Sequence, residues 1–347
     1  VILLANVLVA FASDEDTVTT KMSEATNEFS INLAKKIFSE ENKNVVTSPV
    51  SVSTLLALVL QGASGEVKKE LETVLHCEAG QMREEYRKLL QNIKNSKDNA
   101  TVEFANAMFV KNDVNLKETF KNIARNDFLS ESISVNFDNP SNAANIMNSW
   151  AESHTHGKIK NIISEDMINS DTEMFLTNAI YFKSYWENSF PTKSTKNQTF
   201  HSRNQGKVTV PMMFQERHMC VGNIPELDAR WVNIPYKGNR YSFLVVMPTE
   251  INGFDNLETR FNFQHFLNII NTKGIKKPKV HLYLPKFKVS SNLDKLQTTL
   301  AQMGLHETLS KGTISEMSER PITVSDVIQK AVIEIDEKGS EAAAENR

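Results

Sequence analysis

Two histidines, His154 and His156, stand two residues apart in the segment SHTHGK. Imidazole nitrogens at this spacing on a strand can contribute to a zinc site. No cysteine, aspartate or further histidine is placed to complete a set of ligands. We therefore interpret the pair as polar residues at the end of a helix, and we expect neither a metal nor a cofactor.

A second group with chemical potential is the basic run Lys276-Lys277-Pro278-Lys279, which we interpret as a solvated turn rather than an anion site. The sequence also contains none of the short signatures GxSxG, HExxH, GxGxxG and GxxxxGK[ST]. Catalysis by side chains is therefore not indicated, and we expect that the protein is not an enzyme.

The composition is that of a globular protein with no general attraction for polyanions. Of 347 residues, 40% are hydrophobic, and 39 Lys and Arg against 42 Asp and Glu give a net charge of −3. A net charge this close to zero gives no general electrostatic attraction for nucleic acid or for anionic lipid, so we expect that the protein binds neither nucleic acid nor a membrane. The two cysteines, Cys77 and Cys220, permit at most one disulfide and are expected to be packed thiols.

The N-terminal run VILLANVLVAFAS is apolar up to the small-residue spacing Ala10-Phe11-Ala12. This pattern is typical of the end of a secretory signal peptide, so we interpret residues 1–12 as a partial signal peptide, with a buried helix as the alternative. Two glycosylation sequons, at Asn99 and Asn197, would be usable in that compartment. The sequence thus favours a secreted, extracellular glycoprotein.

Helical and strand patterns divide the chain. Apolar periodicity predicts helices over residues 21–39, 48–60, 66–75, 81–93, 143–163 and 293–303, the second of them beginning at Ser48-Pro49. Strand patterns occur in VEFANAMFV, MFLTNAIYF, KVTVPMMF, WVNIPY, YSFLVVMP and VHLYLPKFKV. Helices crowd the first half and strands the second, which indicates an α+β fold. No repeat or linker interrupts the chain, so we expect a single domain over residues 13–347; a boundary near residue 170 has no support.

The last twelve residues, DEKGSEAAAENR, follow the run VIQKAVIEI, whose apolar residues fit a strand. If the strand continued, one face would carry the small residues Ser340, Ala342, Ala344 and Asn346, and the other would carry Glu341, Ala343, Glu345 and Arg347. Gly339 would supply a pivot. The alternative is an exposed helix capped by Ser340, which local propensity favours but which is too short to be stable in water.

The string IDEKGSEAAA resembles the reactive-loop hinge of the serpins, large protease inhibitors whose loop inserts into their own central sheet. The segments NVVTSPVSVSTLLALVLQGASGEVKKEL and NSWAESHTHGKIKNII are similar to the serpin helices under and across that sheet. The segments FLTNAIYFKSYWENSF, VPMM, IPYKG, VMP and LPKFKV are similar to later serpin strands. The resemblance covers Glu24 to Arg347, and the asparagine content is our reason to suspect an arthropod source.

This resemblance implies a fold of about nine helices and three β-sheets with a large central sheet A, held in a metastable state. It implies a monomer whose partner is a target serine protease. The protease cleaves the loop, the loop enters sheet A as an extra strand, and the covalently trapped enzyme is distorted. The implied function is serine-type endopeptidase inhibition by this suicide-substrate mechanism.

The resemblance also assigns residues to three regions. The reactive-loop hinge comprises Glu337, Lys338, Gly339, Ser340, Glu341, Ala342, Ala343 and Ala344. The breach, where the loop leaves sheet A, comprises Trp186, Lys286 and Glu337, with an expected ion pair between Lys286 and Glu337. The shutter, where the central strands part, comprises Ser48, Ser51, Asn178 and Gln329, polar side chains that must hydrogen-bond one another in an apolar layer. Gln329 stands where the family usually has a histidine, which removes the pH dependence of that residue.

The family continues beyond the hinge with the scissile bond and closing strands, so we expect this chain to lack its C-terminal part and to be inactive alone. A non-inhibitory serpin acting as a carrier, storage protein or chaperone is the alternative. Bulky, charged or proline residues on the inward face of the hinge would block insertion. Ser340, Ala342 and Ala344 would not, and we prefer inhibition, although Glu345 and Asn346 depart from the usual alanine and threonine.

Overall fold

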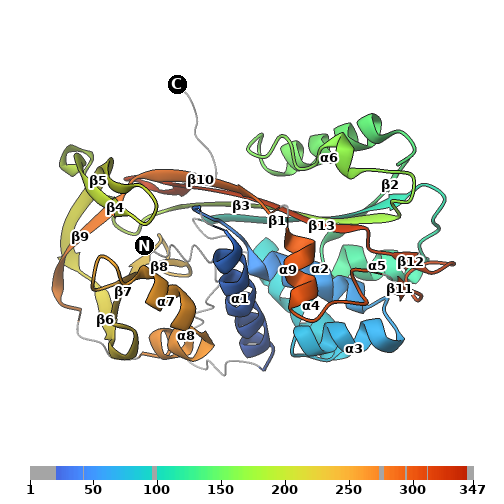
Figure 1. Ribbon diagram of the computed structural model, residues 1–347, viewed down its shortest axis with the longest axis horizontal. Coiled ribbons are helices and arrows are strands. Elements are labelled where there is room, and N and C mark those ends of the chain that lie inside the picture. The colour runs from blue at the N-terminus through green and yellow to red at the C-terminus, as the bar shows by residue number, and fades with distance from the viewer. Residues whose placement is uncertain are drawn as a thin grey trace.

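The computed structural model describes residues 21–341 except 42, 96–99, 273–276, 294 and 311. The expected signal peptide (residues 1–12), Lys276, the sequon at Asn99 and the hinge residues Ala342, Ala343 and Ala344 lie outside the described residues. The described part of the chain forms nine α-helices and fourteen strands. Figure 1 shows how they are arranged.

The helices are α1 (Lys21–Glu40), α2 (Pro49–Leu60), α3 (Gly65–Val74), α4 (Ala79–Lys94), α5 (Glu118–Asp127), α6 (Pro140–His154), α7 (Phe254–Arg260), α8 (Phe263–Ile270) and α9 (Leu296–Gln302). The strands are β1 (Ala100–Lys111), β2 (Ser130–Val135), β3 (Met174–Tyr185), β4 (Lys196–Ser202), β5 (Gly206–His218), β6 (Cys220–Ile224), β7 (Ala229–Pro235), β8 (Ser242–Pro248), β9 (Lys279–Pro285), β10 (Phe287–Asn292), β11 (Thr313–Ile314), β12 (Ile322–Thr323), β13 (Asp326–Ile335) and β14 (Gly339–Glu341).

The largest sheet, sheet A, is mixed and has the strand order β10-β13-β14-β3-β1-β2. Strands β13 and β3 pair directly, in parallel, only from Asp326 opposite Phe175 to Lys330 opposite Ala179. Further along, β14 lies between them and is antiparallel to both. At the centre of sheet A, β13 and β3 therefore pair with each other at one end and are separated by β14 at the other.

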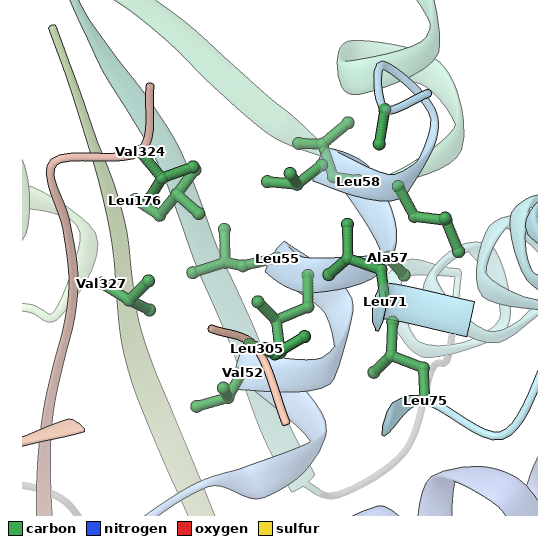
Figure 2. Packing of buried hydrophobic residues seen from close by; sticks show 14 of the residues in the cluster. Val52, Leu55, Ala57, Leu58, Leu71, Leu75, Leu176, Leu305, Val324 and Val327 are labelled. Atoms are coloured by element: carbon green, nitrogen blue, oxygen red, sulfur yellow. The ribbon is translucent and has the colours of Figure 1, made fainter. Parts of the chain in front are cut away.

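Helices cover both faces of sheet A (Figure 1). On one face α6 contributes Trp150, which contacts Phe109 of β1 edge-on with ring centroids 5.5 Å apart. On the other face α2 is apolar almost all round, and its described side chains are nearly all buried. Figure 2 shows Val52 and Leu55 of α2 directed toward the strands that carry Leu176 and Val327. Because α2 is central to the largest core, it fixes the position of the polar residues at its first turn.

Two three-stranded sheets, β4-β5-β9 and β6-β7-β8, lie at the end of sheet A near β14, and β11-β12 forms a small two-stranded sheet. One face of β6-β7-β8 packs on α1, α7 and α8, with Ile31, Trp231 and Phe266 in a shared cluster. Its other face packs against sheet A through Phe243 and Ile335. These sheets and helices confirm the predicted α+β fold with a dominant central sheet.

Two predicted helix bounds are wrong. The helix predicted over residues 143–163 ends at His154, because His156 and Gly157 adopt positive φ values of 50° and 77°. The apolar residues beyond it pack in the same core as α6 without being helical, which explains the misleading periodicity. The helix predicted over residues 293–303 is shorter, at Leu296–Gln302. VHLYLPKFKV forms two strands, β9 and β10, rather than one.

None of the described helices is both long enough and apolar enough to cross a membrane.

Candidate functional site

The turn after β13 brings the hinge back into sheet A. Asp336 accepts hydrogen bonds through Oδ1 from the backbone N–H groups of Lys338 and Gly339, at 2.8 and 3.1 Å. A Cβ atom at Gly339 would lie 2.0 Å from the carbonyl oxygen of Ser184, so only glycine fits where the turn enters the sheet. Ser340 and Glu341, which follow, are thereby directed between β13 and β3.

Ser340 is the first side chain of β14 that faces the interior. It lies opposite Ile335 of β13 and Ser184 of β3, and only 2% of its surface is exposed. Its hydroxyl is hydrogen-bonded to the hydroxyl of Tyr236. Burial raises the pKa of Tyr236 well above its usual range, so this contact remains a neutral hydrogen bond. A small polar residue therefore fits the inward position, in agreement with the strand alternative for this tract.

The breach residues meet around the same turn. Lys286 Nζ lies 2.9 Å from Glu337 Oε2, and the hydroxyl of Thr195 donates to Glu337 Oε1 at 2.8 Å. Burial opposes ionisation of Glu337, but the hydrogen bonds from Lys286 and Thr195 outweigh it and lower the pKa of Glu337. The hydrogen bond to Glu337 correspondingly raises the pKa of Lys286. Both groups are thus charged at neutral pH.

Trp186 holds the other side of this turn. Its indole Nε1 donates to the carbonyl oxygen of Asp336, and its backbone N–H donates to that of Lys338, both at 2.9 Å. Its ring stacks on Tyr236 with centroids 4.6 Å apart and planes 8° apart. Trp186 is therefore linked to the backbone of the turn and, through Tyr236, to Ser340.

The shutter residues form one buried network centred on Gln329. Gln329 Nε2 donates to Asn178 Oδ1 at 3.2 Å and to the carbonyl oxygen of Ser48 at 2.9 Å. Gln329 Oε1 accepts from the hydroxyl of Thr47 and from the backbone N–H of Ser48, at 2.7 and 2.9 Å. The hydroxyls of Ser48 and Ser51 are paired at 2.7 Å. The network ties β13, β3 and the start of α2 together.

Four residues of these networks were not singled out from the sequence. Thr47, Asn106, Thr195 and Tyr236 complete them, and Asn106 Oδ1 accepts a hydrogen bond from Asn178 Nδ2 at 2.8 Å. Asn106 carries the clearest sequence signal, because it is a polar residue inside the apolar strand pattern FANAMF. The other three gave no local signal that distinguishes them from surface residues.

The remaining candidate residues lie apart from these networks. His154 and His156 pair with different glutamates, Glu131 and Glu103, at 2.9 and 3.0 Å. Among the described residues, no group of three or more His, Cys, Asp or Glu is arranged to hold a metal ion. Asn197 is exposed on β4. Cys77 is buried and Cys220 half-buried, and neither forms a disulfide.

Comparison with known proteins gives consistent matches. A family model described as Serpin (serine protease inhibitor) matches residues 24–347. Serine protease inhibitor 42Dd of Drosophila melanogaster is 32% identical over 311 residues, which cover 88% of this chain and 82% of that protein.

Solved structures are similar over nearly the whole chain. Serpin48 of the insect Tenebrio molitor, described as highly specific, has a TM-score of 0.86 and 28% identity over 96% of this chain and 91% of its own. Human thyroxine-binding globulin has a TM-score of 0.84 and 27% identity over 94% of this chain and 89% of its own.

Proposed function

The chain belongs to the serpin family, and we propose that the full-length protein inhibits serine endopeptidases by cleavage-triggered insertion of its reactive loop into sheet A. The observation that carries the proposal is the position of β14. Residues Gly339–Glu341 pair with β13 on one side and with β3 on the other. The residues that follow enter the sheet if this pairing continues.

The register of β14 indicates how far insertion proceeds before sheet A must change. Ala342, Ala343 and Ala344 would come opposite Phe182, Tyr181 and Ile180 of β3, by extension of the pairing of Ser340 with Ser184. At these positions β3 and β13 are not paired with each other. From Glu345 onward, insertion would have to break the direct pairing of β13 with β3, which begins at Lys330 and Ala179. Asn346 would then lie at the level of Asn178 and Gln329.

The free energy available from insertion is substantial. About a dozen new ladder hydrogen bonds at a net ~1 kcal/mol each give on the order of 10 kcal/mol before packing, less what the parallel ladder and the shutter lose. This free energy is comparable with the stability of a whole native protein, about 5–15 kcal/mol. Insertion can therefore supply the work of distorting a covalently attached protease.

We infer that the partner is a secreted or extracellular serine protease and that the inhibitor acts there as a monomeric glycoprotein. The support is the N-terminal sequence pattern and the exposure of Asn197 on β4. The identity of the protease depends on residues around the scissile bond, which the family places after the hinge.

The test is covalent complex formation by the full-length protein with trypsin-like, chymotrypsin-like and elastase-like proteases, followed by denaturing electrophoresis. We expect an SDS-stable complex with at least one of them. Ala342→Arg, on the inward face with Ser340, should leave loop cleavage intact but convert the protein from inhibitor to substrate. Ala343→Arg, on the opposite face, is the matched control and should retain inhibition. Equal complex yields for the two variants would refute the assigned hinge.

The similarity to thyroxine-binding globulin favours a second candidate function, a non-inhibitory carrier. The two candidates differ in the response to cleavage of the loop. An inhibitor of this type should melt at a markedly higher temperature after a single nick in the loop, since the nicked strand completes sheet A. No covalent complex together with an unchanged melting temperature would favour the carrier.

A further inference from the structure

Lys330 is the residue of β13 at which direct pairing with β3 begins, opposite Ala179. Its side chain shares a face of the strand with Ile328, which belongs to the core cluster under α6, and with Val332, which packs against that cluster. Lys330 Nζ donates to the carbonyl oxygen of Asn161, in the segment after α6, at 2.7 Å. Lys330 is therefore half-buried on the face of sheet A that α6 covers (Figure 1).

The ammonium group of Lys330 has no carboxylate partner among the described residues. The Asn161 carbonyl accepts from one of its N–H groups, and further donors remain. Lys111 of β1 makes a similar contact with the carbonyl oxygen of Ser170, at 2.7 Å, but it also has Asp138 Oδ1 at 3.9 Å. Because a half-buried ammonium loses part of its hydration, a carboxylate beside Lys330 would be stabilised there.

The register of β14 indicates which residue of the hinge tract reaches Lys330. Glu341 lies opposite Glu334 of β13. If this antiparallel pairing continues, Glu345 comes directly opposite Lys330, with Ala179 of β3 on its other side. Residues directly opposite each other in antiparallel strands share a face, and their Cβ atoms are about 4.5–5.5 Å apart. The carboxylate of Glu345 would therefore lie within reach of Lys330 Nζ.

A shifted register would leave this carboxylate without a counter-charge on β13. A slip of two residues, about 7 Å along the sheet, keeps the faces and places Glu345 opposite the apolar side chain of Val332 or of Ile328. A slip of one residue turns Glu345 to the other face of the sheet. Burying a charge without a partner is costly. Among these registers, only the one that continues β14 gives Glu345 a positive partner on β13.

From these features we propose that Lys330 is a positioning residue for loop insertion, which forms an ion pair with Glu345 in the inserted state and thereby selects the register of the new strand. The inference rests on the proposed insertion and adds to it a defined counter-charge and depth. Glu334, which faces Glu341, has its own counter-charge in Lys288, with 3.6 Å between Nζ and Oε2. Glu334 therefore does not require Lys330.

The first test compares the melting temperatures of the full-length protein before and after a single nick in the loop beyond the hinge, in enough guanidinium chloride to keep both transitions measurable. Lys330→Gln and Glu345→Gln should each reduce the rise on nicking by roughly 2 °C, and the double variant should lose no more than either alone. Glu345→Lys combined with Lys330→Glu should restore the rise. Lys111→Gln is the matched control, because it removes the same kind of hydrogen bond to a carbonyl but should leave the rise unchanged.

The second test measures the register itself. In the nicked protein, Glu345→Cys with Lys330→Cys should form a disulfide on oxidation, because Cα atoms directly opposite each other lie within the roughly 4.4–6.8 Å that a disulfide spans. Glu345→Cys with Val332→Cys is the matched control and should not, because the diagonal separation is larger, about 7–8 Å. Peptide mass spectrometry distinguishes the new link from Cys77 and Cys220. Neither disulfide should form before the nick.

Three results would overturn the proposal. Single variants that leave the rise in melting temperature unchanged, or a double variant that loses the sum of two independent effects, would exclude the ion pair. A disulfide to position 332 rather than to position 330 would exclude the register. If nicking does not raise the melting temperature of the wild type, the proposed insertion fails together with this inference, whereas a normal rise without coupling between Lys330 and Glu345 rejects this inference alone.

Discussion

Gln329 on β13 donates a hydrogen bond to Asn178 on β3, with 3.2 Å between Nε2 and Oδ1, where neither residue has any exposed surface. The same amide group accepts a hydrogen bond from the backbone N–H of Ser48 and donates one to the carbonyl oxygen of Ser48. One side chain thus joins two strands of sheet A to the start of the helix beneath them. A strand that inserted to this depth would have to break the Gln329–Asn178 contact.

Gln329→Leu should lower the free energy of unfolding by about 2–4 kcal/mol, because it leaves the Ser48 N–H, the Thr47 hydroxyl and the Asn178 oxygen buried without this partner. Urea unfolding measures the change. Gln91→Leu makes the same replacement at an exposed position of α4 and serves as control. Similar small changes in both variants would show that the network contributes little.

Gln329→His should introduce a loss of stability on acidification near pH 6.5, the ordinary pKa of histidine. The backbone N–H of Ser48 requires an acceptor at this position, and only a neutral imidazole provides one. The fold should therefore lower the pKa of this histidine, so its contribution is present above the unfolded-state pKa and lost as the pH falls. Unfolding curves at pH 7.5 and 5.5 test this. A wild-type protein with the same pH dependence would contradict it.

Glu337→Gln should remove the ion pair with Lys286 and lower stability by about 0.5–1 kcal/mol at neutral pH, a modest value because Lys286 is partly exposed. The pKa of Glu337 is lowered in the fold, so the wild-type advantage is present above the ordinary glutamate pKa of about 4.3 and is lost as the pH falls below it. The melting temperatures of the wild type and of Glu337→Gln, measured from pH 7 down to pH 3, should become equal. Curves that stay parallel would mean that another group causes the difference.

Asp326→Asn should stabilise the protein at neutral pH. Burial raises the pKa of Asp326, the first residue of β13, to about 6, so keeping it ionised at pH 7.5 destabilises the fold by on the order of 1–2 kcal/mol. Asparagine keeps an oxygen for the Val327 N–H, which Asp326 Oδ1 accepts at 2.7 Å. Because this pKa is raised, the penalty grows as the pH rises through 4 to 6. The variant should therefore melt higher than wild type at pH 7.5 and equally at pH 4.

Much of the architecture follows from local patterns. The apolar periodicity of residues 50–60 and the Ser48-Pro49 start located α2. The strand patterns located β1 and β3, whose central residues are buried on both faces. The pattern failed where apolar residues serve a core without regular structure, as after His154, and where a strand is largely polar, as in SESISV of β2. Apolar periodicity reflects which residues are buried, and residues such as those after His154 are buried without being helical.

The site depends on pairs that are distant in sequence. Lys286 and Glu337 are 51 residues apart and were matched only through the family resemblance. Tyr236 and Ser340 are 104 residues apart, and neither has a local pattern that indicates the other. Such contacts arise when the junction of β9 and β10, the end of β7 and the turn after β13 converge at one end of sheet A. The pattern of a single segment does not indicate which distant segments will lie beside it, so these contacts could not be predicted from local sequence.

The mixed character of sheet A has an energetic consequence. Strands β13 and β3 run parallel, whereas β14 runs antiparallel to both. Each residue added to β14 beyond Ala344 would exchange one parallel ladder for two antiparallel ladders, and antiparallel pairing is slightly more stable per residue. Lengthening β14 would therefore stabilise sheet A both by adding a ladder and by replacing parallel with antiparallel pairing, and this gain depends on strand direction rather than on any single side chain.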